Sequence, residues 1–226
     1  MNSLNIAVLV AITLLGVGSS YRYPSRYTRN ANKFRFRRSQ EFRFEDCGRN
    51  PNRPIHFLAL SVTPFPVKYP GQMLLSFQLN VTETLPTSLS VDTTLERKVQ
   101  LLFRETTFNI PCISVGNSQF GTCTHKDLCS RMAETYDPCD CPAFFEENDF
   151  PCSCPIPDGE YVLKDLPIDI PEISGGLSVF ADGDYELMSE FYDGDTGREL
   201  GCLRFTMSME KDKEDEEEDD SWWGKR

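Results

Sequence analysis

Residues 72–81 read QMLLSFQLNV, and this stretch decides the fold. Apolar side chains fill every second position and the positions between them are mostly polar, so the inward set would be Met73, Leu75, Phe77, Leu79 and Val81. Alternation over this length predicts a strand with one buried face. Similar patterns predict further strands at Ile55–Val62, Leu89–Leu95, Val99–Phe103, Tyr161–Ile170, Tyr185–Tyr192 and Leu200–Met209.

Turn residues separate these strands, for example at Asp158-Gly159 and in the run Asp193–Gly197. One helix is predicted at Thr124–Thr135, where Thr124 and Asp127 have the spacing of a capping box. About seven strands with turns at this spacing are typical of an antiparallel sandwich or cup. The sequence therefore predicts an all-β fold with one short helix.

The first 38 residues differ from the rest of the chain. Ile6–Leu15 is an apolar run too short to span a bilayer, and small residues follow it, so residues 1–20 are predicted to be a signal peptide. Residues 21–38 carry seven Lys and Arg and no acid, and they end in an Arg-x-Arg-Arg pattern. We interpret them as a propeptide or, with similar weight, as a basic arm that folds back on the acidic body.

The other end is strongly acidic. Residues 210–220 hold nine acids and two lysines, so residues 210–226 are predicted to be a disordered tail that attracts calcium loosely. The remaining residues, 39–209, suit one domain and carry 12 basic and 26 acidic side chains. This acidity argues against nucleic acid as a partner, because phosphate binding needs clustered basic residues.

Export decides how the nine cysteines are interpreted. Outside the cytosol, cysteines at this density favour disulfides over a metal site, although Cys139, Cys141, Cys152 and Cys154 could imitate a metal knuckle. Asn80-Val81-Thr82 is the single glycosylation sequon, so Asn80 is a candidate glycan site.

No motif predicts catalysis, a cofactor or a metal. The sequence has two histidines and no Gly-x-Ser-x-Gly elbow, and Asp195-Thr196-Gly197 occurs once between two predicted strands, as a hairpin turn would. Binding is the better hypothesis. The apolar residues Leu177, Val179 and Phe180 follow Ser174-Gly175-Gly176, and a glycine-hinged apolar loop suits a lid or an interface with lipid.

The cysteine order and several short segments resemble the ganglioside-activator family, lysosomal lipid-transfer cofactors of the ML lipid-recognition class. The resemblance covers about residues 45–209, and its segments are Asp46-Cys47, Leu95–Val99, Ile110–Cys112, the Cys123 to Cys129 spacing, Pro151–Pro155, Gly159–Tyr161 and Leu200–Cys202.

The resemblance implies a β-cup whose apolar cavity holds lipid chains. It also implies four disulfides, which would be Cys47–Cys202, Cys112–Cys123, Cys129–Cys154 and Cys141–Cys152. Cys139 would then be free or paired with a second chain. Residues 174–180 take the place of the family's membrane-touching loop, and alternation offers six residues for the cavity walls: Leu75, Phe77, Leu79, Val99, Leu101 and Phe103.

The resemblance and the apolar loops together imply a secreted or lysosomal protein that is not an enzyme. It would extract a glycosphingolipid or similar lipid during transient membrane contact and carry it or present it to a glycosidase. The alternative is a secreted interaction or matrix protein that uses the cup as a scaffold, with the acidic tail attracting calcium and Cys139 forming a dimer.

Overall fold

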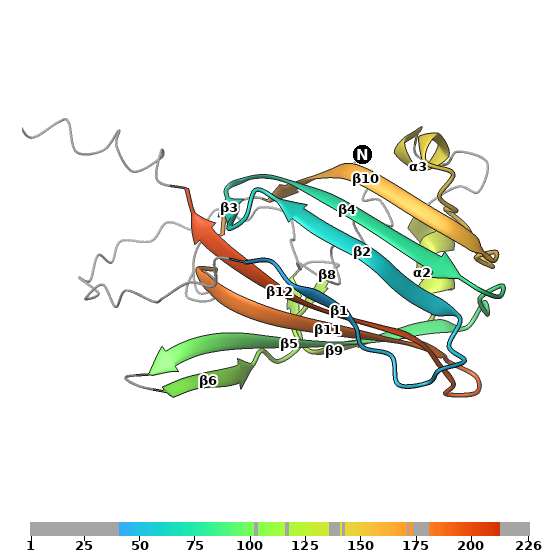
Figure 1. Ribbon diagram of the computed structural model, residues 1–226, viewed down its shortest axis with the longest axis horizontal. Helices are drawn as coiled ribbons and strands as arrows, with labels where there is room; N and C mark the ends of the chain where they lie inside the picture. The colour runs from blue at the N-terminus through green and yellow to red at the C-terminus, as the bar shows by residue number, and fades with distance from the viewer. Residues whose placement is uncertain are drawn as a thin grey trace, which may run out of the picture.

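The computed structural model describes residues 41–101, 104–115, 118–135, 141, 143–170, 172–173 and 181–212. Within these ranges most residues belong to β-strands that pair antiparallel, and two short helices lie near one end of the strands (Figure 1). The predicted all-β antiparallel fold is confirmed. Neither helix of this described part is long and apolar enough to cross a membrane.

The quoted stretch forms the centre of a three-stranded sheet. Its order is β10 (Gly159–Ile170), β4 (Gly71–Val81) and β2 (Ile55–Thr63), and we call it the small sheet. The predicted alternation holds along β4, where Met73, Leu75, Phe77 and Val81 are buried and the residues between them are more exposed. The apolar face of β4 therefore points inward over its full length.

The second sheet is larger and faces the small one. Its order is β1 (Phe44–Asp46), β12 (Glu199–Lys211), β11 (Gly183–Asp193), β5 (Leu89–Leu101) and β6 (Arg104–Asn109). β3 (Val67–Tyr69) runs parallel to β12, and β9 (Cys123–His125) pairs with β5. β7 (Ile113–Val115) and β8 (Ser118–Phe120) pair with each other. We call the assembly of β1, β3, β5, β6, β9, β11 and β12 the large sheet; β7 and β8 form a separate pair.

Most predicted strand ends differ from the structure by one or two residues, and two differences affect the pairing of the strands. The stretch from Leu89 is one continuous strand to Leu101, not two strands, because β5 pairs first with β11 and then with β6. β12 continues through Lys211, two residues into the predicted tail, since it gains β3 as a neighbour at Met209. The run Asp193–Gly197 is the turn between β11 and β12, closed by a hydrogen bond from the Gly197 amide to the Asp193 carbonyl (2.7 Å).

The helix predictions also need correction. Helix α2 spans Leu128–Thr135 and begins four residues later than predicted, because the preceding residues form β9. Thr124 is therefore no cap. Asp127 caps the helix, with its carboxylate accepting bonds from the Ser130 amide (3.0 Å) and hydroxyl (2.6 Å). These bonds lower the pKa of Asp127. A second helix, α3 (Ala143–Glu147), was not predicted.

The two sheets approach each other along one edge, which we call the closed edge. Strands β1 and β12 of the large sheet contact β2 of the small sheet there. A Cβ added at Gly201 would lie 2.7 Å from the Cβ of Ile55, so only glycine permits this spacing. The rings of Phe57 and Phe191, from opposite sheets, are 5.6 Å apart. The closed edge is thus a tight contact between sheets.

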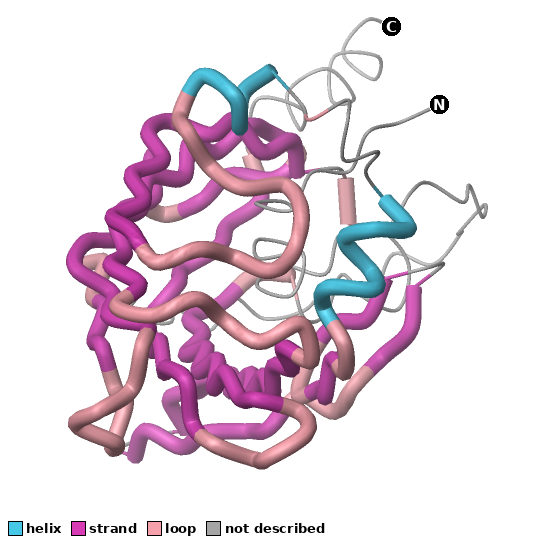
Figure 2. The backbone as a smooth tube through the Cα atoms, turned by 90° about the vertical axis from the view of Figure 1, so that its right-hand side faces the viewer, coloured by secondary structure: helices cyan, strands magenta, loops and turns pink. Residues whose placement is uncertain are grey.

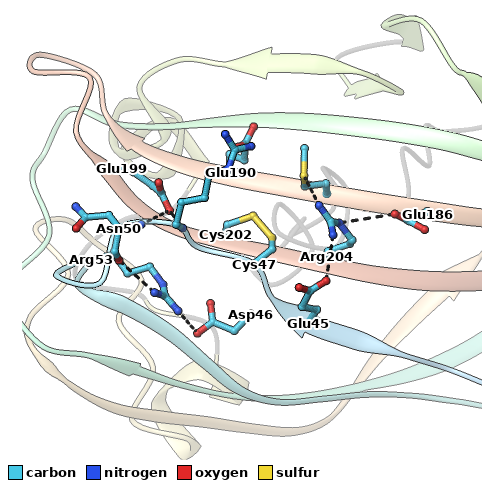
Figure 3. Close-up of a disulfide and its surroundings, with 12 residues drawn as sticks. Glu45, Asp46, Cys47, Asn50, Arg53, Glu186, Glu190, Glu199, Cys202 and Arg204 are labelled. Carbon is cyan, nitrogen blue, oxygen red and sulfur yellow. Dashed lines mark hydrogen bonds and ion pairs between the residues drawn. A yellow bond between two sulfur atoms is a disulfide. The ribbon is translucent and has the colours of Figure 1, made fainter.

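Figure 3 shows a disulfide at the closed edge, between Cys47 after β1 and Cys202 in β12. The Cys47 amide also donates to the Cys202 carbonyl (3.0 Å). Ion pairs flank the disulfide: Arg53 contacts Asp46 at 2.6 Å and Arg204 contacts Glu45 at 3.0 Å. Covalent and polar contacts therefore fix the chain entering the domain to its last strand.

The opposite edge is built differently, and we call it the open edge. The small sheet ends there with β10, and the large sheet ends with β5 and its neighbours β6 and β9. Among the described strands, none pairs from one sheet to the other. Helix α2 contacts β5 on this side. Figure 2, which looks along the sandwich, shows the strands as an arc with α2 on its open side.

The other three disulfides lie between β6 and β10 in the sequence, mostly in segments outside the two main sheets. They join Cys112 to Cys123, Cys129 to Cys154 and Cys141 to Cys152. Together with Cys47–Cys202, these are the same pairs that the family resemblance implies. Cys139 lies outside the described residues, so its predicted role in a dimer stays a prediction. Residues 1–40 and 213–226, with the predicted signal, arm and most of the tail, also lie outside them.

The apolar interior as candidate functional site

The candidate site is the space between the two sheets, which apolar side chains fill from both sides. The small sheet contributes inward residues from each of its strands: Leu60, Val62, Met73, Leu75, Phe77, Leu163, Leu166, Ile168 and Ile170. All of them are buried. They follow the period of two in β2, β4 and β10, interrupted only by bulges at Phe57/Ala59 and Leu163/Leu166. One wall of the interior is therefore continuous and apolar.

The large sheet supplies the facing wall. Its inward residues in the same cluster are Leu95, Tyr185, Leu187, Leu203, Phe205, Met207 and Met209. Burial raises the pKa of Tyr185 to about 12, so its hydroxyl is neutral at any physiological pH. No described Asp, Glu, Lys or Arg is buried in this core. The interior suits hydrocarbon and excludes charge.

An aromatic group closes one end of the interior. Phe145 of α3 is fully buried, and its ring lies 5.5 Å from that of Phe150. Phe150 in turn packs edge-on against Phe77 at 5.7 Å and Tyr161 at 5.6 Å. The disulfides at Cys152 and Cys154 follow directly. We call this group the aromatic plug, defined by Phe145 and Phe150.

The other end of the interior lies where β10 ends and β11 begins, and the β10–β11 connection lies between them in the sequence. β10 ends at Ile170 and β11 begins at Gly183, beside Met209 of β12. The buried side chains at this end include Met73, Ile168 and Met207. Leu177, Val179 and Phe180 belong to this connection but lie outside the described residues, so their predicted contact with lipid stays a prediction.

The six predicted wall residues do not share one location. Leu75 and Phe77 are buried in the core, and Leu79 packs against it half-buried. Val99 is half-buried and pairs with Thr106, beyond the last β5–β11 pair at Lys98 and Asp184. It belongs to the β5–β6 extension. Leu101 ends β5 with its side chain outside the description, and Phe103 lies outside it altogether.

Sequence reasoning missed the polar groups on the inward face of the large sheet. Thr93, His125 and Ser189 are each at most 3 % exposed. The hydroxyl of Thr93 has partners in the Gly121 and Cys123 carbonyls and the Cys123 amide. Neither ring nitrogen of His125 nor the Ser189 hydroxyl has a hydrogen-bond partner among the described residues. One signal in the sequence could have revealed Ser189 as an inward residue. It occupies an alternate position of the same strand as Leu187 and Phe191.

His125 should make stability depend on pH. Burial, and then the nearby charge of Arg131, hold its pKa below the ordinary value of 6.5, against the opposing effect of Asp92. The unfolded chain therefore binds the proton more tightly. Stability is complete above pH 6.5 and falls by up to about 1.4 kcal/mol per pH unit below it, until the folded pKa is reached.

Replacing His125 with leucine should reduce the loss of stability between pH 7 and pH 5. Urea denaturation at several pH values measures this, and a titration of the His125 ring by NMR gives its pKa directly. An unchanged slope in the variant, or a His125 pKa above 6.5, would contradict the expectation.

The predicted glycan site lies on the outside of the sandwich. Asn80 is half-buried on the outward face of β4, opposite His56 of β2 and Glu160 of β10. The sequon's Thr82 follows the end of the strand and is exposed, with its amide bonded to the Pro54 carbonyl (2.9 Å). A glycan on Asn80 would cover the small sheet and leave the interior unobstructed. Modification itself stays a prediction.

A metal site and a surface pocket are the two other candidate sites. Among the residues that the structure describes, no group of three His, Cys, Asp or Glu side chains could hold a metal ion. A pocket of about 460 Å³ lies beside α2, lined by residues such as Asp127, Ser130 and Ser153. Its lining includes small polar side chains and the Cys129–Cys154 disulfide, so it does not extend the apolar interior.

Comparison with known proteins matches most of the chain. Residues 41–209 match the family model described as ML domain. The chain is similar to the ganglioside GM2 activator of Mus musculus, at 26 % identity over 171 residues, which cover 74 % of this chain and 81 % of the relative. The ganglioside GM2 activator of Macaca fascicularis is 27 % identical over 173 residues, covering 74 % and 83 %.

Two solved structures also match, each with a TM-score of 0.36 and 14 % identity. One is a Niemann-Pick type C2 protein from Japanese carpenter ant, covering 74 % of this chain and 98 % of that one. The other is chicken MD-1 complexed with lipid IVa, covering 74 % and 88 %.

Proposed function

Because the chain belongs to the ML-domain family, we propose that it binds a lipid between its two sheets and transfers it between membranes without catalysing a reaction. The apolar interior carries this proposal. Both facing walls are mainly apolar, with Thr93, His125 and Ser189 as the polar residues of the large sheet's wall, and no Asp, Glu, Lys or Arg is buried within the described core. Hydrocarbon chains are the ligand class that such walls accommodate.

The energetics of transfer support the proposal. Moving a lipid chain from an apolar environment into water costs about 0.8 kcal/mol of free energy for each CH₂. Exposing about ten methylenes therefore costs about 8 kcal/mol. A bilayer and the protein interior both avoid this loss. Exchange between them is therefore nearly balanced, and the protein acts by keeping the chains out of water between membranes.

We further propose that the ligand is a glycolipid whose sugar remains outside the sandwich. A sugar cannot satisfy its hydroxyl groups among the inward leucines and phenylalanines, so burial would be unfavourable. The head group would then remain accessible to a glycosidase while the chains are held. The similarity to ganglioside GM2 activators supports this ligand class. A secreted or lysosomal location, with transient membrane contact, fits the same role.

Transfer between vesicles tests the function directly. Donor vesicles would carry a fluorescent lipid, and acceptor vesicles would report its arrival as the concentration of the protein rises. We expect transfer in proportion to protein concentration and a one-to-one lipid complex by native mass spectrometry. No bound lipid together with no transfer would overturn the proposal and favour an interaction protein, for which a dimer dependent on Cys139 on a non-reducing gel is the matching observation.

Adjacent residues of β4 provide a matched pair of variants. Leu75 is 2 % exposed and points inward, whereas Leu74 lies on the outward face of the same strand. Tryptophan at position 75 should fill part of the interior and slow transfer about tenfold, as overpacking by 1–3 kcal/mol implies. Leu74→Trp should transfer normally.

Circular dichroism and urea denaturation would show that each variant folds, and the smaller change Leu75→Phe guards against misfolding at this site. Equal transfer rates for folded Leu75 and Leu74 variants would show that the lipid does not occupy the space at Leu75.

A further inference from the structure

Ser189 occupies the middle of the inward face of the large sheet. It lies in β11 between the inward residues Leu187 and Phe191, and β11 itself lies between β12 and β5. Its cross-strand neighbours are Leu203 and Thr93. Only 2 % of Ser189 is exposed. A small polar residue thus stands where the pattern of the strand calls for a large apolar one.

The hydroxyl of Ser189 lacks a hydrogen-bond partner among the described residues. Its neighbour Thr93 bonds instead to backbone groups around Cys123. A buried hydroxyl without a partner lowers stability, and alanine at the same position would avoid that loss. Serine here therefore offers nothing to the lipid-free fold.

Ser208 shows what a structural serine does in the same sheet. It is fully buried in β12, and its hydroxyl donates to the Asp184 carboxylate at 2.6 Å. The two serines are matched in residue type, sheet and burial, and they differ in whether the protein supplies a partner. Ser208 is therefore the reference for Ser189.

We propose that the Ser189 hydroxyl hydrogen-bonds an uncharged polar group of the bound lipid and so makes the interior selective. This inference rests on the proposed function, because it requires a lipid between the sheets. The surroundings define the chemistry of the partner. Leu187, Phe191 and Leu203 give no counter-charge, so an ionised group would be unpaired there.

A serine hydroxyl both donates and accepts, which matches a hydroxyl or an amide close to the lipid chains. Esters only accept hydrogen bonds. The inference therefore predicts preference for a lipid with an amide and a hydroxyl at the junction of head group and chains over a lipid with two esters there.

The test uses sphingomyelin and phosphatidylcholine as probes, because both have a phosphocholine head group and differ at this junction. Fluorescent forms with equal chain lengths would be transferred by wild type, Ser189→Ala and Ser208→Ala. We expect wild type to transfer sphingomyelin about fivefold faster than phosphatidylcholine, as one hydrogen bond allows. Ser189→Ala should reduce that ratio to about one, because sphingomyelin transfer slows more than phosphatidylcholine transfer.

Stability of the lipid-free proteins gives an independent readout. Ser208→Ala should lower the melting temperature, and Ser189→Ala should leave it unchanged or raise it. A Ser189→Ala protein that keeps the wild-type ratio overturns the inference. So does a Ser189→Ala protein that melts as early as Ser208→Ala, since the hydroxyl would then serve the fold, for instance through an internal water. If wild type transfers neither probe and no fluorescent glycolipid either, the proposed function itself fails and this inference with it. Transfer of the glycolipid alone would leave the proposed function standing and overturn this inference.

Discussion

Replacing Cys47 and Cys202 together with alanine is expected to lower the free energy of unfolding by about 5 kcal/mol, the largest effect of any change considered. The disulfide joins residues separated by 155 positions. Loop-closure entropy in the unfolded chain grows with the logarithm of loop length, and about 5 kcal/mol is its value for a loop of this size. Few single domains retain a useful margin after such a loss.

The pair Cys112 and Cys123 is the matched control. It closes a loop with a separation of 11, for which the same relation gives about 3 kcal/mol. In each pair one cysteine is buried, Cys202 or Cys123. Urea denaturation of both double-alanine variants, with the other disulfides intact, measures the difference. Equal losses would show that chain entropy does not govern the contribution of the closed-edge disulfide.

Replacing Phe145 with alanine should have the second largest effect and lower the free energy of unfolding by about 3–5 kcal/mol. Phe145 has no exposed surface, and its ring contacts Phe150, which packs on Phe77 of the small sheet. Its carbonyl also accepts the Phe150 amide at 2.8 Å. Removing the ring leaves a void that the disulfide-linked segment around it cannot close.

Phe108→Ala is the control for Phe145→Ala, because Phe108 is 51 % exposed on β6. Its loss should be within about 0.5 kcal/mol. Urea denaturation gives the stabilities, and hydrogen exchange over residues 143–157 shows whether the damage is at the aromatic plug. If both phenylalanine variants lost the same small amount, Phe145 would not anchor the plug to the interior.

Patterned strands were predictable because their alternation reports one buried face. The β4 pattern identified Leu75 and Phe77 as inward, and the hairpin at Asp193–Gly197 followed from turn chemistry. Val99 follows the same alternation, but β5 is paired with β11 only as far as Lys98. Val99 lies beyond that point and pairs with β6 instead. The pattern alone could not show that this part of β5 lies outside the packed core. Alternation shows which face of a strand is buried, but it does not show which other element packs against that face.

Other features depend on contacts between distant residues. β3 is three residues long and exists because β12 lies beside it at Met209. Thr124 matched a helix-cap pattern, but it lies in β9, which pairs with β5 instead of forming the start of a helix. The orphan hydroxyl of Ser189 is visible only when the side chains around it are placed. Such features arise from tertiary structure, which overrides local preference.

The closed edge has a consequence for the range of lipid sizes that one chain could hold. With Gly201 against Ile55 and Cys47 bonded to Cys202, the sheets cannot separate along that line. Any widening of the interior would therefore require the small sheet to tilt about the closed edge. Because β10 lies two strands from β2, about 10 Å away, a tilt of about 10° would move it by about 1.7 Å. Lipids with different chain cross-sections could then fit between the sheets while the hydrogen bonds within each sheet stay intact.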